Sequence, residues 1–541
     1  MKASAVQHES QAQLQVDAAI ERMMVLRGQG RYQETLDIYL RIERTYPDWV
    51  DTLMWIDAAS DCIYLARWQD AIRNAQTALA QDANNFAPYD ALAQVHGILG
   101  HWEEARHYGL QALNIRARRF SGEPVIPLPE PAPMPPLPSA QTRERNIIAL
   151  LLFGRDCKYC EPAILNAQEQ PNIYPHWVCR FYVDASVPEN VINRLRASGA
   201  QIVQVEGTAA QWAGPMWRWL ALGNPQAHRI LFRDADSVIS SREAGAVEQW
   251  LASGKRFHMM RDWGSHTELI LAGLWSAVAG SLPPFQDLMG RFMSEPLDSR
   301  RFADQHFLRQ YVWPYARTSL MQHDSMFGFM GAAPFPNEQK SEGFHVGRTE
   351  SSSVITIKTN LLNGSEVTWG LYGIQKLDNG QTQEKLICAY PGTVKEGIVK
   401  VQHIPKHYAQ WLEQGTAQVR LLGSSATQNT QITASSENSL LVHESQIPLQ
   451  VDAAFQQMRV LHEQGRYQEA LDICLQIAHT HSEIANGWGN AAVNCVKLER
   501  WQDAIRYGLA ALARGGGNKF ELYDALAHAH SPRGQWAETR R

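Results

Sequence analysis

The pattern of hydrophobic and polar positions divides the chain into three kinds of segment. Residues 1–118 and 441–541 repeat apolar positions at the spacing of paired helices, so both are expected to be all-α. From Asn146 onward, short apolar runs alternate with helical patterns, which predicts βαβ units and a mostly parallel sheet. After Arg348, β-branched residues and Gly-containing turns predict a small antiparallel region that ends near Leu422.

The two helical segments are copies of one another. The sequence HESQAQLQVDAAIERMMVLRGQGRYQETLDIYLRI near the start returns as HESQIPLQVDAAFQQMRVLHEQGRYQEALDICLQI from His443. Self-similarity of this kind is typical of repeat architectures. Inside the first copy, Trp68 and Ala71 recur 34 residues later as Trp102 and Ala105, which is the period of a helix pair.

This pattern resembles the tetratricopeptide repeat over Val16 to Leu113, where an aromatic residue opens the second helix of each pair and small residues lie where helices cross. The resemblance implies four buried alanines, namely Ala59, Ala78, Ala93 and Ala112. The C-terminal copy reaches Arg541 as its third unit begins its second helix, so that repeat is expected to be incomplete. Stacked helix pairs form concave surfaces, which we expect to recruit a protein partner or an acceptor.

Two further segments are expected to be linkers. The prolines from Pro124 to Pro138 remove backbone donors and favour an extended conformation, so this stretch predicts a semi-rigid spacer, with a docking ligand for another protein as the alternative. The expected order is helical repeats at 1–118, a Pro-rich linker at 119–144, an α/β domain at 145–348, a β-rich extension at 349–422, a linker at 423–440 and a second helical block at 441–541.

Composition and charge narrow the functional class. The chain has 541 residues, of which 45% are hydrophobic and 19% charged, and this predicts a multidomain globular protein. A formal net charge of -5 gives no basic field for nucleic acid. The start of the chain lacks the apolar core of a signal peptide, and no apolar run approaches the ~20 residues of a membrane span, so we expect a cytoplasmic protein. Seven scattered cysteines fit a reducing compartment, and the Cys157 and Cys160 pair has no second pair at zinc-ligand spacing.

The residues that indicate chemistry follow the apolar run HRILF. Asp234 and Asp236 stand one residue apart where this buried strand is expected to end. Ligands of open α/β sheets bind at the carboxyl ends of the strands. Paired carboxylates are hard oxygen ligands for Mg²⁺ or Mn²⁺, whose other positions can be filled by diphosphate oxygens and water. The alternative for an isolated Asp-x-Asp pair is a simple helix cap.

A longer run of motifs favours the site over the cap. Three segments occur in order: RDADSVISSREAGAVEQWLASGKRFHMMRDWGSHTELILAGLWS, then ADQHFLRQYVWPY, then MQHDS. Their sequence resembles a bacterial family of glycosyltransferase-like domains with the A-type nucleotide-diphospho-sugar transferase fold, which is Rossmann-related. The order of parts is also similar to glycogenin and the lipooligosaccharide galactosyltransferases. The resemblance covers about 200 residues.

The resemblance implies a metal site of three protein ligands. Asp236 would be a direct ligand, Asp234 would contact the metal or the ribose, and His323 would supply the third ligand, with Asp324 able to assist. Such a metal, Mn²⁺ or Mg²⁺, neutralises the diphosphate leaving group. Without the ordered motifs, His323 would be interpreted as an ordinary surface or core histidine.

The resemblance also implies donor and acceptor contacts. Gly154, Arg233 and Gly273 are expected to line the nucleotide-sugar, Gly154 and Gly273 because they allow close approach of the backbone. If the enzyme inverts, Asp262 or Asp304 would take the acceptor proton. If it retains, Asp304 or Gln305 would face the reacting carbon. Both aspartates also fit simple turn or helix-start roles, and the sequence does not choose between these mechanisms.

Together these features predict a metal-dependent glycosyltransferase that moves a sugar from a nucleotide-diphosphate donor to a protein or glycan acceptor. The alternative of another class is a non-catalytic scaffold in which two repeat arrays bind partners around a degenerate transferase domain. A phosphohydrolase or nucleotidyltransferase using the same aspartates is a weaker alternative, because the additional carboxylate and glycine motifs of such sites are missing.

Overall fold

The computed structural model describes residues 2–127, 132–294, 303–336, 344–376 and 381–422, and towards the C-terminus residues 435–436, 458, 461, 466–480, 485–498 and 500–512. The chain forms two compact units, Met1–Ser435 and Ser436–Arg541. The linker predicted at 423–440 lies outside the described residues apart from Ser435 and Ser436, and so does the third repeat unit of the C-terminal block.

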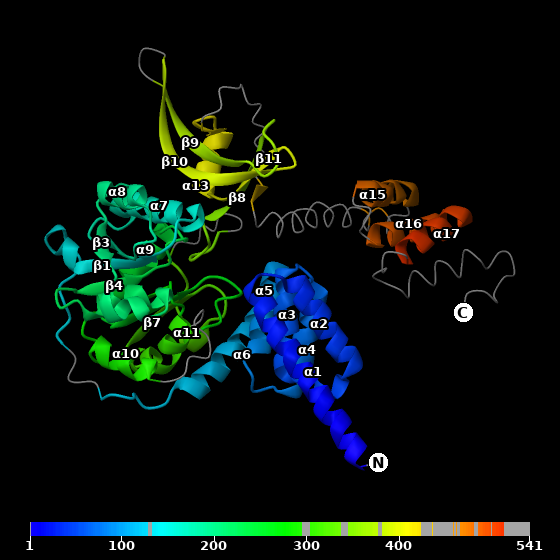
Figure 1. Cartoon of the computed structure of the whole chain (residues 1–541), viewed down its shortest axis with the longest axis horizontal. Helices are drawn as coiled ribbons and strands as arrows, with labels where there is room; N and C mark the ends of the chain where they lie inside the picture. Colours follow the sequence, from blue (N-terminus) through cyan, green and yellow to red (C-terminus); the bar gives the residue numbers. More distant parts are fainter. Residues whose placement is uncertain are drawn as a thin grey trace. The chain divides into compact units, whose positions relative to one another are not determined.

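The first unit begins with helices that pack against their neighbours in sequence order (Figure 1). They are α1 (Lys2–Gly28), α2 (Tyr32–Thr45), the 3₁₀ turn η1 (Pro47–Trp49), α3 (Thr52–Tyr64), α4 (Trp68–Gln81), α5 (Ala87–Ile98) and α6 (Trp102–Phe120). The Asp51 side chain caps α3 by accepting a 2.9 Å hydrogen bond from the backbone of Met54. The alanines expected at the helix crossings are fully buried: Ala59, Ala78, Ala93 and Ala112.

A seven-stranded mixed sheet follows, with strand order β3-β2-β1-β4-β6-β5-β7. Strands β1, β2, β3 and β4 run parallel, and β7 runs parallel to β5, whereas β6 is antiparallel to both of its neighbours. The prediction of a mostly parallel sheet therefore holds with one reversed strand. The strands are β1 (Asn146–Leu152), β2 (Val178–Val183), β3 (Gln201–Gln204), β4 (Arg229–Phe232), β5 (Phe257–Arg261), β6 (Trp275–Val278) and β7 (Leu320–Asp324).

Helices and short turns connect these strands and cover the sheet (Figure 1). They are η2 (Ala140–Arg145), α7 (Cys157–Ile173), α8 (Glu189–Ala197), η3 (Gly207–Gln211), η4 (Gly214–Gly223), α9 (Ser241–Ser253), α10 (Phe285–Met293), α11 (Ala303–Phe307), the π-helical turn η5 (Leu308–Val312), α12 (Trp313–Ala316) and η6 (Phe329–Gly331).

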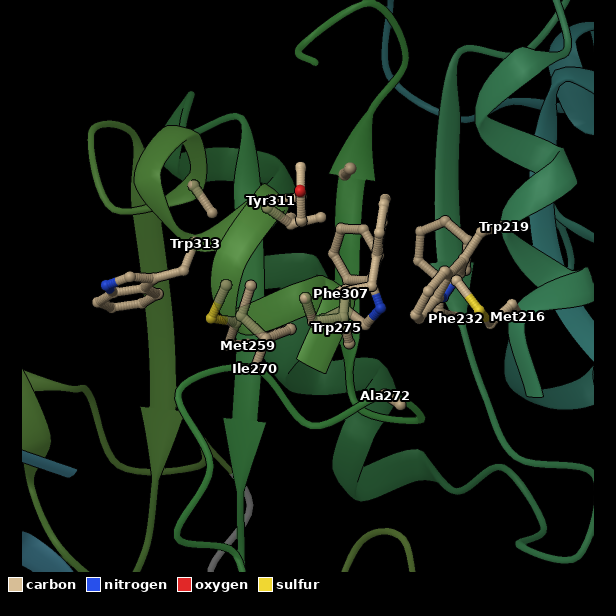
Figure 2. Packing of buried hydrophobic residues seen from close by; sticks show 14 of the residues in the cluster. Met216, Trp219, Phe232, Met259, Ile270, Ala272, Trp275, Phe307, Tyr311 and Trp313 are labelled. Atoms are coloured by element: carbon tan, nitrogen blue, oxygen red, sulfur yellow. The ribbon is translucent and has the colours of Figure 1, made fainter. Parts of the chain in front are cut away.

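Aromatic rings fill the core on one face of the sheet. Phe232 of β4 stacks on Trp275 of β6 with ring centroids 4.2 Å apart, and Trp219 of η4 stacks on Phe307 of α11 at 4.9 Å. Figure 2 shows these four side chains gathered in one layer. Burial of a large side chain stabilises a fold by roughly 1.5–3 kcal/mol, so this layer holds η4 and α11 firmly against the strand ends.

The helices and the sheet share part of this core. Ala105 and Leu113 of α6 belong to the same buried cluster as Phe232 and Trp275. At the polar edge of the junction, the buried Arg116 guanidinium donates to Asp90 at 2.7 and 2.6 Å and to Glu268 at 3.2 Å. The helical array is therefore fixed to the α/β part by packing and by paired charges.

The described residues of the Pro-rich segment make hydrogen bonds to the α/β part. Arg229 of β4 donates to the backbone carbonyls of Pro135 and Pro136 at 2.9 and 2.5 Å. Near the start of the segment, the Tyr315 hydroxyl donates to the carbonyl of Ile126 at 2.7 Å. An extended proline segment has unpaired carbonyls, and here buried or partly buried side chains of the α/β part satisfy them.

A second, antiparallel sheet with order β12-β9-β10-β11-β8-β13 forms the β-rich extension (Figure 1). Its elements are β8 (Ser351–Lys358), β9 (Glu366–Lys376), β10 (Thr382–Lys395), β11 (Ile398–Pro405), α13 (Lys406–Glu413), β12 (Ala417–Leu421) and the short β13 (Ser435–Ser436). The buried Glu161 of α7 anchors this extension: it accepts from Arg194 at 2.8 Å and from the hydroxyls of Tyr390 at 2.5 Å and Tyr408 at 2.8 Å.

The described residues of the second unit are helical. They form α15 (Tyr467–Thr480), α16 (Ala485–Lys497) and α17 (Trp501–Leu512). Their shared core includes Leu471, Cys474, Ala491 and Cys495, all fully buried. In the part of the chain that the structure describes, none of the helices combines the length and the apolar character that crossing a bilayer requires.

Candidate functional site

The parallel strands place three loops at one edge of the first sheet. The loop after β1 contains Gly154, the loop after β2 contains Asp184 and Ser186, and the loop after β4 contains Asp234. Because β1, β2 and β4 are parallel neighbours, their carboxyl ends meet at this edge, where α/β proteins bind ligands. The sheet thus brings residues some 80 positions apart into one candidate site.

Gly154 has the backbone geometry expected of a close-approach position. Its φ of +77° lies in the left-handed region, and a Cβ added to it would meet nothing within 4 Å. Its N–H donates to the Ser186 hydroxyl at 2.6 Å, and that hydroxyl in turn donates to Asp184. The loops after β1 and β2 therefore hold one another while leaving space over Gly154.

Asp234 and Gly273 are brought into direct contact. A Cβ on Gly273 would lie 2.0 Å from a carboxylate oxygen of Asp234, so no other residue fits there without a shift. The Asp234 side chain is half exposed. The segment before β6 therefore presses its backbone against the carboxylate that follows β4.

Arg218 joins these residues to Asp304. Its guanidinium, only 2% exposed, pairs with the Asp234 carboxylate and donates to the Arg233 carbonyl at 3.1 Å and to Asp304 at 3.4 Å. The Nε of Arg218 is buried without a partner among the described residues. Arg218 did not figure in the sequence prediction, although an arginine inside the apolar run GPMWRWLALG is a signal of a buried charge.

Asp304 and Gln305 open α11 beside this cluster. Burial raises the pKa of Asp304, the Arg218 cation opposes that shift, and the nearby Asp234 adds to it. One orientation of the Gln305 side-chain amide gives both its nitrogen and its oxygen a hydrogen-bond partner. In that orientation Gln305 donates to the Ile270 carbonyl at 2.8 Å and accepts from the Ala272 N–H at 3.2 Å. The Asp-Gln pair thus contacts Arg218 with one residue and the Ala-Gly segment with the other.

Asp236 lies on the other side of the same loop, beside the β-rich extension. Burial, and after it the Asp234 carboxylate, raises the pKa of Asp236 to about 6. The Asp236 carbonyl accepts from the backbone of Glu350 at 2.7 Å, and its carboxylate accepts a 3.4 Å hydrogen bond from Thr349. The extension therefore contributes backbone and side-chain contacts to the second aspartate of the pair.

Arg233 is placed elsewhere than predicted. Its guanidinium is buried in the core, where it pairs with Glu243 at 2.8 Å and donates to the carbonyls of Phe232 and Trp275. Successive strand residues point to opposite faces, so the residue beside Asp234 faces inwards. The structure does not bring the Arg233 side chain to the candidate site, and a nucleotide-binding role for it is not supported.

His323 is likewise turned into the core. Its ring is fully buried on β7, with Nδ1 2.8 Å from His258 Nε2 and Nε2 2.8 Å from the Gln249 side-chain oxygen. Burial lowers the pKa of His323 to about 4, so the ring is neutral at pH 7. Both ring nitrogens have protein partners, and the structure does not bring His323 to Asp234 and Asp236 as the predicted third ligand.

Asp262 follows β5 and is closed off by its own partners. Its carboxylate accepts from Arg242 at 3.0 and 2.9 Å, from the Val346 backbone at 2.9 Å and from the Ser325 hydroxyl at 2.5 Å. Burial alone would raise the pKa of Asp262, but these hydrogen bonds outweigh it and hold the pKa below its usual value. Asp262 therefore fastens the segment at Val346 and is poorly suited to accept a proton.

The donor atoms present fit a hard divalent cation that takes most of its ligands from water and substrate. Asp234 and Asp236 are close enough for one carboxylate to raise the pKa of the other, and a cation between them would relieve that repulsion. Among the described residues, no three His, Cys, Asp or Glu side chains gather as a metal cage requires. Mg²⁺ and Mn²⁺ sites that use one or two carboxylates plus phosphate oxygens need no such cage.

Cys157 and Cys160 are free, buried thiols. Both thiols are buried, and burial raises the pKa of Cys160 to about 12 and that of Cys157 further still. A thiol held protonated is neither a good nucleophile nor a metal ligand.

Comparison with known proteins gives similarity in fold alone. No family profile and no curated protein matches the sequence. Solved structures with similar parts include an O-GlcNAc transferase from Thermobaculum terrenum (15% identity, 40% of this chain and 49% of that chain, TM-score 0.25). A glucosyl-3-phosphoglycerate synthase from Mycobacterium tuberculosis, solved with phosphoglyceric acid, shares 14% identity over 36% of this chain and 73% of its own, with a TM-score of 0.21.

A third similar structure is a mannosyltransferase from Pyrobaculum calidifontis, solved with GDP-Man and Mn²⁺ (15% identity, 48% of this chain and 70% of that chain, TM-score 0.24). All three are glycosyltransferases. The aligned part spans about half the length of the Thermobaculum protein.

Proposed function

We propose that the first unit is a metal-dependent glycosyltransferase that moves a sugar from a nucleotide-diphosphate donor to an acceptor hydroxyl. One observation carries the proposal: Asp234, Gly273, Asp304 and Gln305 come from three separate segments and meet around Arg218 at the carboxyl edge of the sheet. Such convergence of polar groups at a strand-end edge is typical of a ligand site.

Asp234 and Asp236 would hold the metal, Mn²⁺ or Mg²⁺, and the donor diphosphate would complete its coordination. When bound, such a cation neutralises the charge that develops on the diphosphate as its bond to the sugar breaks. Arg218 pairs with the Asp234 carboxylate and so helps to fix its position in the loop after β4. Gly154 would line the donor through its backbone, because nothing lies within 4 Å of the space that a Cβ would fill. Gly273 would line the donor next to the Asp234 carboxylate, which its backbone contacts.

Asp304 is the carboxylate best placed to act on the acceptor. It is 11% exposed and has one cationic partner at 3.4 Å, whereas the Asp262 carboxylate is engaged by three other groups. A carboxylate with a raised pKa accepts a proton more readily at neutral pH. Gln305 would hold the Ala272 and Gly273 backbone in the position that the sugar requires.

The helical repeats would recruit the acceptor, a protein or a glycan, or a partner protein. The first array suits this role because α6 shares its core with the sheet domain, so a molecule bound on the array is held at a fixed distance from the site. The tetratricopeptide character of both arrays is part of this proposal.

Ligand-dependent stability tests the proposal directly. We expect one nucleotide-sugar from a panel of UDP-, GDP-, CMP- and dTDP-sugars to raise the melting temperature of the full chain only when Mn²⁺ or Mg²⁺ is present. The D236N variant should lose this shift, and the D287N variant, in which an exposed aspartate of α10 is changed, should keep it.

Two results would overturn the proposal. One is the absence of a shift with every donor in the presence of metal, which would favour the scaffold alternative. The other is an equal shift in D236N and in the unchanged protein, which would place any nucleotide site away from this loop.

A further inference from the structure

An aromatic cluster lies where the first helical array meets the α/β part. Trp102, the first residue of α6, is 51% exposed and lies edge-on to Trp263, with ring centroids 5.8 Å apart. His345 stacks on Trp263 at 4.9 Å and 11°. Trp263 therefore contacts two rings, one of which is a large exposed indole, and an exposed group of aromatic rings is a candidate binding surface.

The junction beneath this cluster is rigid. A Cβ on Gly264 would lie 2.8 Å from the Ala93 carbonyl of α5, and a Cβ on Gly97 would lie 3.2 Å from the Gly264 Cα. The loop that carries Trp263 therefore touches α5 backbone to backbone. The relative positions of Trp102 and Trp263 are fixed by this contact, so the cluster is preformed.

The cluster is close to the proposed site of sugar transfer. Strand β5, which precedes Trp263, is two strands from β4, which precedes Asp234, and two strand spacings are about 10 Å. The chain also connects the two places. Thr349, whose hydroxyl donates to Asp236 at 3.4 Å, lies four positions after His345, and four steps of the chain span at most about 14 Å. An acceptor with one ring on this cluster and a second extending towards Asp236 would thus reach the metal loop.

We propose that Trp102, Trp263 and His345 form an acceptor subsite that binds a sugar ring, so that the helical array supplies part of the acceptor site of the catalytic domain. This inference rests on the proposed transferase function. Aromatic faces suit the apolar C–H face of a pyranose. The Ser265 side chain, exposed beside Trp263, can hydrogen-bond a sugar hydroxyl.

Saturation-transfer NMR on the full chain, with the methyl glycosides of glucose, galactose, mannose and N-acetylglucosamine as probes, tests this subsite. We expect ring protons of at least one glycoside to receive saturation from the unchanged protein. Binding should weaken about fivefold in W102A and in W263A, and W102F should retain most of it, since a second aromatic ring restores the stacking face. The control is Y64A, which removes an equally exposed ring, stacked on Tyr32 in the same array and contacting no catalytic loop.

The donor panel, run on the same variants, separates the two proposals. Donor stabilisation that is equal in W102A and in the unchanged protein, together with glycoside binding that weakens in W102A and W263A but not in Y64A, supports the subsite. Glycoside binding that is absent from the unchanged protein, unaffected in W102A, or lost equally in Y64A overturns the subsite while donor stabilisation stands. Failure of every donor to stabilise the unchanged protein overturns the transferase proposal instead, whatever the glycosides do.

Discussion

At the residue scale, Arg218 is the side chain on which the candidate site depends most. Replacing it by Gln leaves the half-exposed Asp234 and the largely buried Asp304 without their shared cation. Removal of one partner from such a group costs about 3 kcal/mol, so we expect R218Q to lower the free energy of unfolding by that amount and to abolish donor-dependent stabilisation. Urea unfolding followed by circular dichroism measures the first effect.

The control for this prediction is R196Q. Arg196 is 57% exposed and 3.7 Å from Glu189, which is a weak surface pair, so its loss should change stability by less than about 0.5 kcal/mol. An R218Q protein as stable as R196Q would show that the buried guanidinium is not needed to balance the two carboxylates.

Asp236 should give the protein a pH-dependent stability in the absence of metal. Its pKa of about 6 in the folded state lies above the ordinary value, so the folded state binds the proton more tightly than the unfolded chain. The resulting stabilisation is fully present below about pH 4 and is lost as pH rises through about 6. The melting temperature of the unchanged protein should therefore fall as pH rises across this range. The fall should be smaller in D236N, because this variant has no titrating group at position 236.

Metal affinity should have the opposite pH dependence, because a protonated carboxyl is a poor ligand. Binding of Mn²⁺, followed by the loss of its free-ion electron paramagnetic resonance signal, should strengthen from pH 5 to 7 and level off above the pKa of about 6. Affinity that stays constant over this range would exclude Asp236 as the titrating ligand.

The sequence-level prediction placed Asp234, Gly273, Asp304 and Gln305 in one site, and the structure brings these four together. The structure places Arg233, Asp262 and His323 away from these four, because each side chain has a buried partner between 10 and 65 positions away: Glu243, Arg242 and His258. A motif gives the order of residues, but which side chains face the core depends on strand orientation and on partners that no local pattern reveals.

At the element scale, the β-rich extension should depend on Glu161. This side chain is 1% exposed and is the shared acceptor for Arg194, Tyr390 and Tyr408. We expect E161A to destabilise the first unit by about 3 kcal/mol, since one cation and two hydroxyls lose their partner. Hydrogen exchange should quicken in β10 and α13 before it does in β1 and β2. E189A, at an exposed position of α8, should leave the exchange pattern unchanged.

Helices and strands could be predicted where the hydrophobic period and the turn residues indicated the same element. They were harder to predict where the direction of a strand depends on its pairing with distant strands. The strands β1 and β4 coincide with the apolar runs NIIALLL and RILF, and α4 and α6 begin at the tryptophans that mark the repeat. The reversal of β6 could not be predicted, because a short apolar strand such as WSAV has the same pattern in either direction.

At the scale of the whole molecule, the first array and the sheet domain should behave as one cooperative unit. Arg116 stacks on Phe86 at 3.9 Å and pairs with Asp90 and Glu268, while Ala105 and Leu113 complete the core beneath η4. A domain boundary at residue 118, as the sequence suggested, would cut through this shared core. Contacts of this kind depend on residues about 150 positions apart, which is why repeat spacing alone implied a separable module.

Removal of residues 1–118 should therefore unfold the remainder. We expect this shortened chain to aggregate or to lose its near-ultraviolet signal, because it exposes the core that α6 covers. The matched change is removal of residues 437–541, which belong to the second compact unit and should leave the melting of the first unit in place. The prediction would be wrong if the chain lacking 1–118 melted cooperatively and still bound a nucleotide-sugar. The array would then be a separately folded domain, and Trp102 would have no structural reason to belong to the acceptor site.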